Sequence, residues 1–246
     1  MTILQNVNNK LMLDPTGKLY MKGSILAVWN MTESSGTVMG DATSMKNDGT
    51  IGSAVTLNSG SYTFIRDYDS NVIINSPESL YLSNFTFNCW VTPPSNLLYA
   101  TTSNMIIYLR DANSTYRVHF NLNYNASNQF NVGGTLYNGV AVASAGSTSW
   151  QSTGSSYMAT LTWDGTTIKA YVNASVQNII GTLSSGTFSI VPKYAEIGST
   201  ETNGYLQATV NQLAVWNREL SGTEITSLYN SGAGLAYSSW PESLKN

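Results

Sequence analysis

The stretch from residue 210 to residue 232 constrains the fold most strongly, because it has the pattern of a strand followed directly by a short helix. Leu213 and Val215 alternate with Ala214 and Trp216, so an extended chain presents one apolar pair to each side. This alternation is typical of a strand that is packed on both faces. The stretch therefore predicts a β structure of two layers.

A capped helix is expected directly after this strand. Ser221 and Glu224 form a capping box, in which the hydroxyl accepts a free backbone N–H of the first turn and the carboxylate reaches back to the cap. Gly232 can supply the left-handed residue that ends the helix. A helix of about two turns is not stable alone, so it must dock on the sheet. The docking face is expected to comprise Ile225, Leu228 and Tyr229.

Composition narrows the function classes. Only 10% of the 246 residues are charged and the net charge is −3, which argues against nucleic acid because phosphates would not be neutralised. No apolar run reaches membrane-spanning length, so membrane insertion is not expected, and residues 1–20 lack the pattern of a signal peptide. Cys89 is the single cysteine, which excludes an intrachain disulfide and a cysteine-based metal site.

The chain divides into an arm, one large domain and a tail. Apolar residues alternate with polar ones on both sides of the turn at 14–17, which predicts a hairpin arm over residues 1–23. A two-stranded hairpin is marginal alone, so the arm should dock on the domain or pair with another subunit in a homo-oligomer. The domain is expected over residues 24–236, followed by a C-terminal tail over residues 237–246.

Five separated segments resemble, in the right order, the motifs of laminin-G-like, concanavalin A-like domains. They are residues 29–50 (with Trp29, Glu33, Gly36, Asn47, Asp48 and Gly49), 85–91 (FTFNCWV), 157–175, 195–198 and 210–232. The resemblance implies an all-β, concanavalin A-like β-sandwich jelly roll of two antiparallel sheets, with one short C-terminal helix and the N-terminal hairpin arm. The chain departs from the family pattern at Asn211 and Gln212, which replace an acidic pair.

Catalysis is not expected, although this jelly roll also occurs in glycoside hydrolases. Those enzymes need two carboxylates at a fixed separation. The 14 acidic residues are scattered singly, and Asp14, Asp111 and Asp164 have turn contexts. His119, the single histidine, lies mid-strand without a nucleophile motif nearby. The sequence therefore predicts that the protein is not an enzyme.

A calcium site is the second hypothesis. Asp41, Ser44, Asn47 and Asp48 share one loop and offer the hard oxygen ligands that Ca²⁺ prefers. The alternative, favoured by the missing acids at 211–212, is that these residues only shape the turn into the next strand.

Glycan binding is the third hypothesis. Sugars are held by stacking on aromatic rings and by hydrogen bonds from neutral side chains, and the loops of residues 96–156 supply both. The candidate residues are Tyr99, Tyr124, Tyr137 and Trp150. For each of them, a place in the core or at a sheet edge is the alternative.

These observations together predict a non-catalytic structural and surface protein of a virion, with a lectin-like jelly roll that binds host glycans. A virion or extracellular location fits a composition rich in Ser, Thr and Asn without a secretion signal. Other virion or surface subunits are the expected partners. The alternatives are a carbohydrate-binding module, a glycan-active enzyme or a purely structural subunit.

Overall fold

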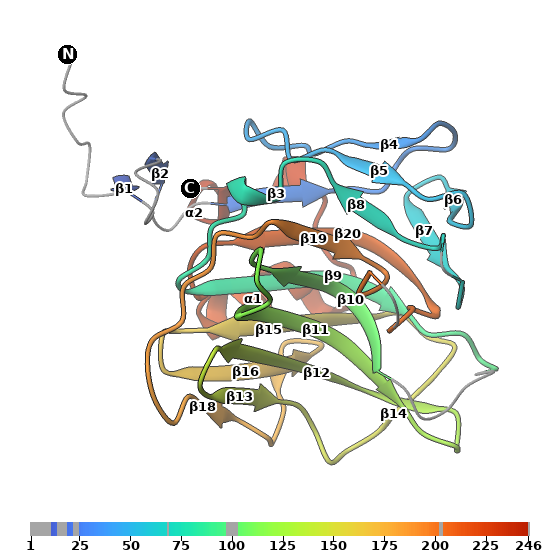
Figure 1. Cartoon of the computed structure of the whole chain (residues 1–246). Helices are drawn as coiled ribbons and strands as arrows, with labels where there is room; N and C mark the ends of the chain where they lie inside the picture. Colours follow the sequence, from blue (N-terminus) through green and yellow to red (C-terminus); the bar gives the residue numbers. More distant parts are fainter. Residues whose placement is uncertain are drawn as a thin grey trace.

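Two antiparallel sheets packed face to face form the body of the protein (Figure 1). The computed structural model describes residues 11–13, 19–21, 25–67, 69–96, 103–201 and 204–245. The expected all-β sandwich with one short helix near the C-terminus is confirmed. None of the helices in these ranges combines the length and the hydropathy that a membrane span requires.

The sheet nearer the viewer in Figure 1, here the front sheet, contains nine strands within the described residues. In spatial order these are β13 (Val142–Ala145), β12 (Gln129–Asn138), β11 (Tyr116–Tyr124), β10 (Ser103–Arg110), β19 (Tyr194–Ile197), β8 (Val72–Ile74), β5 (Gly49–Ile51) and β4 (Val38–Met39), and β14 (Gln151–Ser152) pairs with β12. Strands distant in sequence are thus neighbours at the centre of this sheet, where β19 joins β10 to β8.

The back sheet also has nine strands in the described ranges. Its spatial order is β17 (Ser175–Val176), β16 (Thr167–Val172), β15 (Tyr157–Trp163), β9 (Phe85–Thr92), β20 (Ala208–Trp216), β7 (Ser61–Phe64) and β6 (Thr56–Asn58), while β18 (Gly181–Thr182) pairs with β16 and β3 (Ile25–Trp29) with β20. The turn expected at Asp164 is the β15–β16 connection, where Gly165 adopts a φ of +100°. Glycine has no Cβ and tolerates this conformation.

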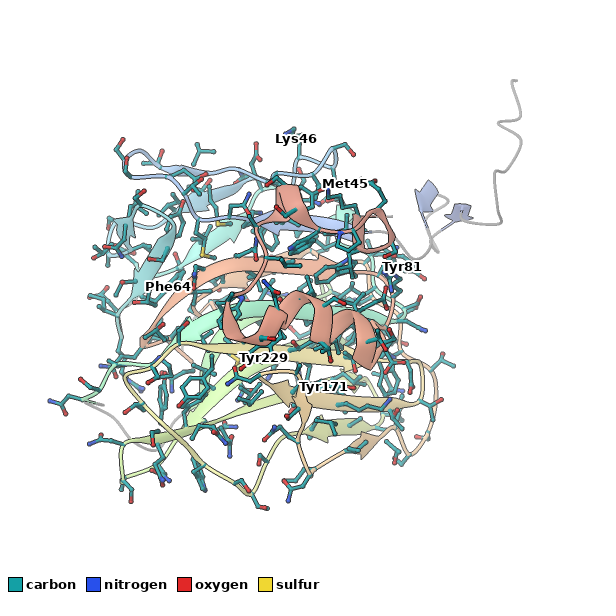
Figure 2. All side chains as sticks on the ribbon, turned by 180° about the vertical axis from the view of Figure 1, so that it is seen from behind. Met45, Lys46, Phe64, Tyr81, Tyr171 and Tyr229 are labelled. Atoms are coloured by element: carbon teal, nitrogen blue, oxygen red, sulfur yellow. The ribbon has the colours of Figure 1, made fainter. Side chains whose placement is uncertain are left out.

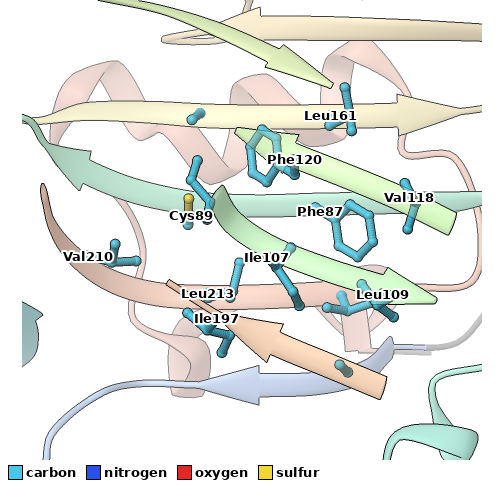
Figure 3. Close-up of a cluster of buried hydrophobic side chains, with 14 of the residues drawn as sticks. Phe87, Cys89, Ile107, Leu109, Val118, Phe120, Leu161, Ile197, Val210 and Leu213 are labelled. Carbon is cyan, nitrogen blue, oxygen red and sulfur yellow. The ribbon is translucent and has the colours of Figure 1, made fainter. Parts of the chain in front are cut away.

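The core lies between the two sheets. Alternate residues of β9 face inward, and the ring of Phe87 stacks on that of Phe120 from the front sheet, with centroids 6.2 Å apart (Figure 3). Cys89 is fully buried beside them, and burial raises the pKa of its thiol. Gly134 lies opposite Leu161, where an added Cβ would approach the leucine side chain to 2.3 Å. The small residue on one sheet therefore makes room for the large one on the other.

Strand β20 carries both the alternation and an irregularity. Leu213 and Val215 belong to the core between the sheets, whereas Ala214 and Trp216 face outward, as the sequence predicts. The pairing of β20 with β9 shifts register between Asn211 and Ala214, and Gln212 has a φ of +48°. This is a β-bulge with one extra residue in the left-handed region.

The outer side of the back sheet is covered by α1 (Gly222–Tyr229) and the segment after it (Figure 2). Ile225 and Leu228 are buried there, and Tyr229 stacks on Trp90 with centroids 6.0 Å apart. Asn230, and not Gly232, is the left-handed residue that ends the helix, with a φ of 46°. Asparagine tolerates this region, and its side chain donates a hydrogen bond of 2.9 Å to the Gly234 carbonyl.

The capping box of α1 is present as expected, with both the Ser221 and the Glu224 side chains engaged. Ser221→Ala should lower the free energy of unfolding by about 1 kcal/mol, because an N–H of the first turn loses its acceptor. Urea denaturation followed by circular dichroism measures this loss. Ser227→Ala, near the end of the same helix, is the matched control and should cost clearly less.

The C-terminal residues pack against the domain. Trp240 is buried, stacks on Trp216 with centroids 5.4 Å apart and donates to the Leu235 carbonyl at 2.9 Å. The 3-10 turns η2 (Asn230–Gly232) and η3 (Tyr237–Ser239) and the helical turn α2 (Glu242–Lys245) form this segment; a further 3-10 turn, η1 (Pro77–Ser79), precedes β9. The expected tail thus continues the cover of the back sheet.

The N-terminal hairpin is also present. Strands β1 (Leu11–Leu13) and β2 (Leu19–Met21) pair antiparallel, with Met12 opposite Tyr20. Residues 1–10 and the turn at 14–17 lie outside the described residues. The division into an arm at 1–23, a domain at 24–236 and a tail at 237–246 stays a prediction.

Candidate functional site

The outer face of the front sheet is the side of the sandwich opposite α1 (Figures 1 and 2). Strand register decides which side chains it presents. Val118 and Phe120 of β11 enter the core, so Arg117 and His119 face outward. By the same alternation β19 directs Tyr194 and Glu196 outward. Charged and aromatic side chains therefore line this face.

A hollow of about 690 Å³ lies over β5, β8 and β19 on this face. Ile73 forms part of its apolar surface and is 53% exposed, although isoleucine is usually buried. Tyr194 is 45% exposed in the same hollow. The polar and charged residues that line it include Thr50, Asp69, Asn71, Lys193, Glu196 and Glu201. The hollow thus combines an open aromatic ring with hydrogen-bonding groups.

Arg110, the last residue of β10, holds the Tyr194 ring in place. Its guanidinium carbon lies 3.5 Å from the ring centroid. Its Nε and a terminal nitrogen donate to the two carboxylate oxygens of Glu201 at 2.5 and 2.7 Å. These hydrogen bonds raise the pKa of Arg110, so the guanidinium stays charged. One face of the tyrosine ring is therefore clamped, and the ring keeps a fixed orientation.

Glu196 forms the polar floor of the hollow. It is only 5% exposed, and its Oε1 accepts from the Asn71 amide at 2.5 Å. Its Oε2 accepts from the backbone N–H of Glu201, also at 2.5 Å. Both oxygens of this carboxylate thus fix neighbouring segments of the hollow.

A row of ring and guanidinium contacts continues across β10, β11 and β12. The rings of Tyr108 and His119 meet edge to face with centroids 5.0 Å apart. The guanidinium of Arg117 lies 4.6 Å from the centroid of the Tyr137 ring. Burial raises the pKa of the Tyr108 hydroxyl. Each of these side chains thus has a partner on the sheet surface: Tyr108 contacts His119, and Arg117 contacts Tyr137.

His119 should make stability depend on pH. Burial, and secondarily the charge of Arg117, lowers its pKa from 6.5 to about 4. The unfolded chain then binds the proton more tightly, so stability should fall as pH drops from about 6.5 towards 4, by on the order of 3 kcal/mol. Urea denaturation at stepped pH values measures this. His119→Gln provides the control, because it lacks this part of the loss while keeping the contributions of the carboxylates.

Asparagine side chains form a ladder at the far end of this face. Asn121 donates to Asn123, Asn123 to Asn131, and Asn131 to the carbonyl of Ser147, at 2.9, 2.9 and 2.8 Å. Each amide is thus already paired with its neighbour. This ladder stabilises the surface of β11 and β12 and leaves less hydrogen-bonding capacity for a ligand.

The three predicted glycan residues that the structure describes, Tyr124, Tyr137 and Trp150, do not form one site. Tyr124 is 4% exposed and its hydroxyl donates to the Gln207 carbonyl at 2.7 Å, so the prediction there is corrected to a core residue. Trp150 is 37% exposed and precedes β14, which pairs with the start of β12, whereas Tyr137 lies near the end of β12. Seven residues separate these points, or about 23 Å at the rise of a strand. Tyr99 lies outside the described residues.

The predicted calcium ligands form a hydrogen-bonded loop. The Asp41 carboxylate accepts four hydrogen bonds, from Val28 N, Thr43 N, Thr43 Oγ1 and Asn47 N. Asp48 Oδ1 accepts from the Asp41 N–H at 2.8 Å.

The other predicted ligands do not complete a calcium site. The Asn47 side chain bridges Leu26 and Ser79, while Ser44 is exposed. The Lys46 ammonium donates to the Asp41 carbonyl at 3.3 Å. A cation needs oxygens that face it without intervening N–H groups, so this donor set does not fit Ca²⁺. The described residues also contain no cluster of three acidic, histidine or cysteine side chains suited to a metal.

Comparison with protein families shows which family the chain belongs to. The family model described as the concanavalin A-like lectin/glucanases superfamily matches residues 66–226, which is more than half of the chain. The chain belongs to this superfamily. The matched segment includes most of the hollow and the whole of β20. No curated protein sequence matches the chain.

Several solved structures share the fold of this superfamily member. The binding domain of Paraclostridial Mosquitocidal Protein 1 matches with a TM-score of 0.66 and 13% identity, over 85% of this chain and 52% of that chain. The Botulinum Neurotoxin serotype G binding domain gives 0.63 and 17%, over 85% and 51%. A Trypanosoma rangeli sialidase in complex with the inhibitor DANA gives 0.62 and 15%, over 83% and 32%. The chain thus spans about half of the toxin domains and a third of the sialidase.

Sequence reasoning missed the residues that line the hollow, above all Tyr194 and Glu196. They flank Ala195 in a strand that is identified from its family motif alone. Arg110, at the end of a strand, and Glu201 stand in the sequence as single charges that belong to no motif. The available signal was the alternation of Tyr194, Ala195, Glu196 and Ile197, which predicts an aromatic and an acidic side chain on one face of a strand.

Proposed function

We propose that this domain binds carbohydrate without chemical conversion, in the hollow beside Tyr194. The observation that carries the proposal is the exposed tyrosine ring, which Arg110 fixes at the edge of a polar hollow of about 690 Å³. A sugar presents an apolar C–H face and several hydroxyls, so it needs a ring to stack on and acceptors beside it. The hollow supplies both. The toxin binding domains that share the fold are consistent with a binding role.

Glycan hydrolysis is the second candidate, because Glu196 and Glu201 line the same hollow. A glycosidase needs one carboxyl group free to donate a proton and a second free to attack or to activate water. Here Glu201 is engaged by Arg110 through both oxygens, and Glu196 holds Asn71 and a backbone N–H. This arrangement favours binding over catalysis. Release of reducing sugar from bound oligosaccharides, abolished by Glu201→Gln, would establish the enzyme instead.

We also propose that the domain serves as an outward-facing subunit of a larger surface assembly such as a virion. The support comes from the low charge of the chain and from the hairpin arm formed by β1 and β2. Two paired strands are marginal alone and gain stability from a neighbour. Light scattering should find an oligomer of the full chain, and removal of residues 1–23 should reduce its mass. A monomer at every concentration contradicts the assembly role.

The experiment that tests binding is a glycan array probed with the labelled full chain. We expect a restricted set of glycans to bind, with equal signal in the presence of calcium and of a chelator, since the loop at Asp41 does not fit the ion. Absence of binding to every glycan would leave the structural role. Loss of binding with chelator would restore the calcium hypothesis for residues 41–48.

A further inference from the structure

A second hollow, of about 660 Å³, lies on the opposite side of the sandwich. It opens where β20 bulges at Gln212, between the outer surface of the back sheet and the segment that follows α1. Trp90 of β9 is half-buried in its wall and stacks on Tyr229. The backbone of Gly234 passes so close to the indole that a Cβ there would lie 3.0 Å from its Nε1. The indole is therefore held rigidly on one side.

The lining of this second hollow differs in charge from the first. The described residues that line it include no Asp, Glu, Lys or Arg, whereas Asp69, Lys193, Glu196 and Glu201 line the hollow at Tyr194. A charged ligand would find no counter-charge here and would lose its hydration. The ligand that fits is neutral and polar.

Three amide side chains in this hollow have hydrogen-bonding capacity to spare. Within the described part of the chain, Asn30, Asn211 and Gln212 make no side-chain hydrogen bond to protein groups, and all three are half-buried. An amide can donate and accept at once, so it matches a sugar hydroxyl, which does the same. Ser156 adds an exposed hydroxyl to the same rim.

The backbone on both sides of the hollow adopts a costly conformation. Gln212 has a φ of +48°, and Met31, which follows Asn30, has a φ of +53°. Non-glycine residues are strained in this region and persist there only where the surrounding structure requires them. Bulges also re-aim side chains next to binding sites. Here the bulge places Gln212 beside Asn211 at the hollow.

We propose that this second hollow binds an uncharged saccharide unit, with Asn30, Asn211 and Gln212 bonding its hydroxyls beside the Trp90 indole. The site is independent of the hollow at Tyr194 and does not require the function proposed there. If both sites are active, one domain can hold two glycans on opposite faces. Avidity for a surface dense in glycans would follow from that geometry.

The test uses the ¹⁵N-labelled full chain and follows the indole signal of Trp90, assigned by its absence in Trp90→Phe. Lactose, maltotriose and diacetylchitobiose serve as neutral probes. At least one should shift this signal, and the double variant Asn211→Ala, Gln212→Gly should raise its Kd at least tenfold. Glycine accepts the φ of position 212, and no protein hydrogen bond is lost, so the variant should keep its thermal stability. If the double variant does not fold, Gln212→Gly alone is used instead and should raise the Kd severalfold.

The outcomes separate the two sites. Tyr194→Ala should leave the Trp90 shift intact. A Trp90 signal that no neutral probe moves, a shift that survives the double variant, or a shift lost in Tyr194→Ala would each overturn the second site. A Trp90 shift in a protein that binds nothing through Tyr194 would refute the proposed function and sustain this one.

Discussion

Tyr194→Ala is expected to weaken glycan binding at least tenfold, about 1.4 kcal/mol, because it removes the ring that we propose stacks on the sugar. Tyr194 is 45% exposed, so loss of its side chain should change the melting temperature little. Titration calorimetry with the best glycan from the array measures the change. The loss should appear as faster dissociation, since contacts within an interface act mainly on the off-rate.

Two further substitutions make this result specific. Tyr194→Phe keeps the ring under Arg110 and should bind within about threefold of the original protein, because stacking is the larger contribution. Tyr137→Ala removes a ring that also contacts a guanidinium, that of Arg117, but that does not line the hollow. This substitution should therefore leave the affinity unchanged. Lost affinity in Tyr137→Ala with full affinity in Tyr194→Ala would move the site to the end of β12.

Asp41→Ala is expected to lower the free energy of unfolding by about 3–5 kcal/mol, since buried donors are left without an acceptor at about 1–3 kcal/mol each. Val28 N, Thr43 N and Asn47 N all point at this carboxylate, which is 3% exposed. A loss of this size is a large part of the stability of a typical domain. The melting temperature should fall by about 10 °C.

The matched control for the loop is Ser44→Ala. Ser44 is exposed and was predicted to bind calcium together with Asp41, so the two substitutions should act alike if an ion holds the loop. We expect Ser44→Ala to change stability by less than about 0.5 kcal/mol. Chelator should leave the melting temperature of the unmodified protein unchanged. A fall with chelator, together with a destabilised Ser44→Ala, would contradict the structural interpretation.

Much of the fold is predictable because local patterns and tertiary packing agree. The alternation in β20, the capping box of α1 and the inward face of β9 all lie where the sequence puts them. The sequence predicts Gly232 as the left-handed residue that ends α1, whereas the structure has Asn230 there. The difference is small, because asparagine and glycine both tolerate the left-handed region. The place of Trp240 depends on docking onto Trp216, which a local pattern does not encode.

The candidate sites are harder to predict, because they depend on which strands become neighbours. Tyr194 acquires its role from Arg110, which lies beside it only because β19 pairs with β10. The ring of Tyr124 and its position near loops favour a binding residue in the sequence, but alternation along β11 turns it inward. At Asp41 the sequence supplies the oxygens, while the direction of the surrounding N–H groups decides what they bind.

The position of β20 in the back sheet also bears on the order in which the protein can fold. This strand pairs with β9 and with both β3 and β7, yet those three precede it by more than a hundred residues. During synthesis the back sheet therefore cannot close until residues 208–216 have left the ribosome. Until then β9 has an unpaired apolar edge, and such edges invite association with other chains. Folding should accordingly be slow, governed by distant contacts, and most vulnerable to aggregation just before β20 arrives.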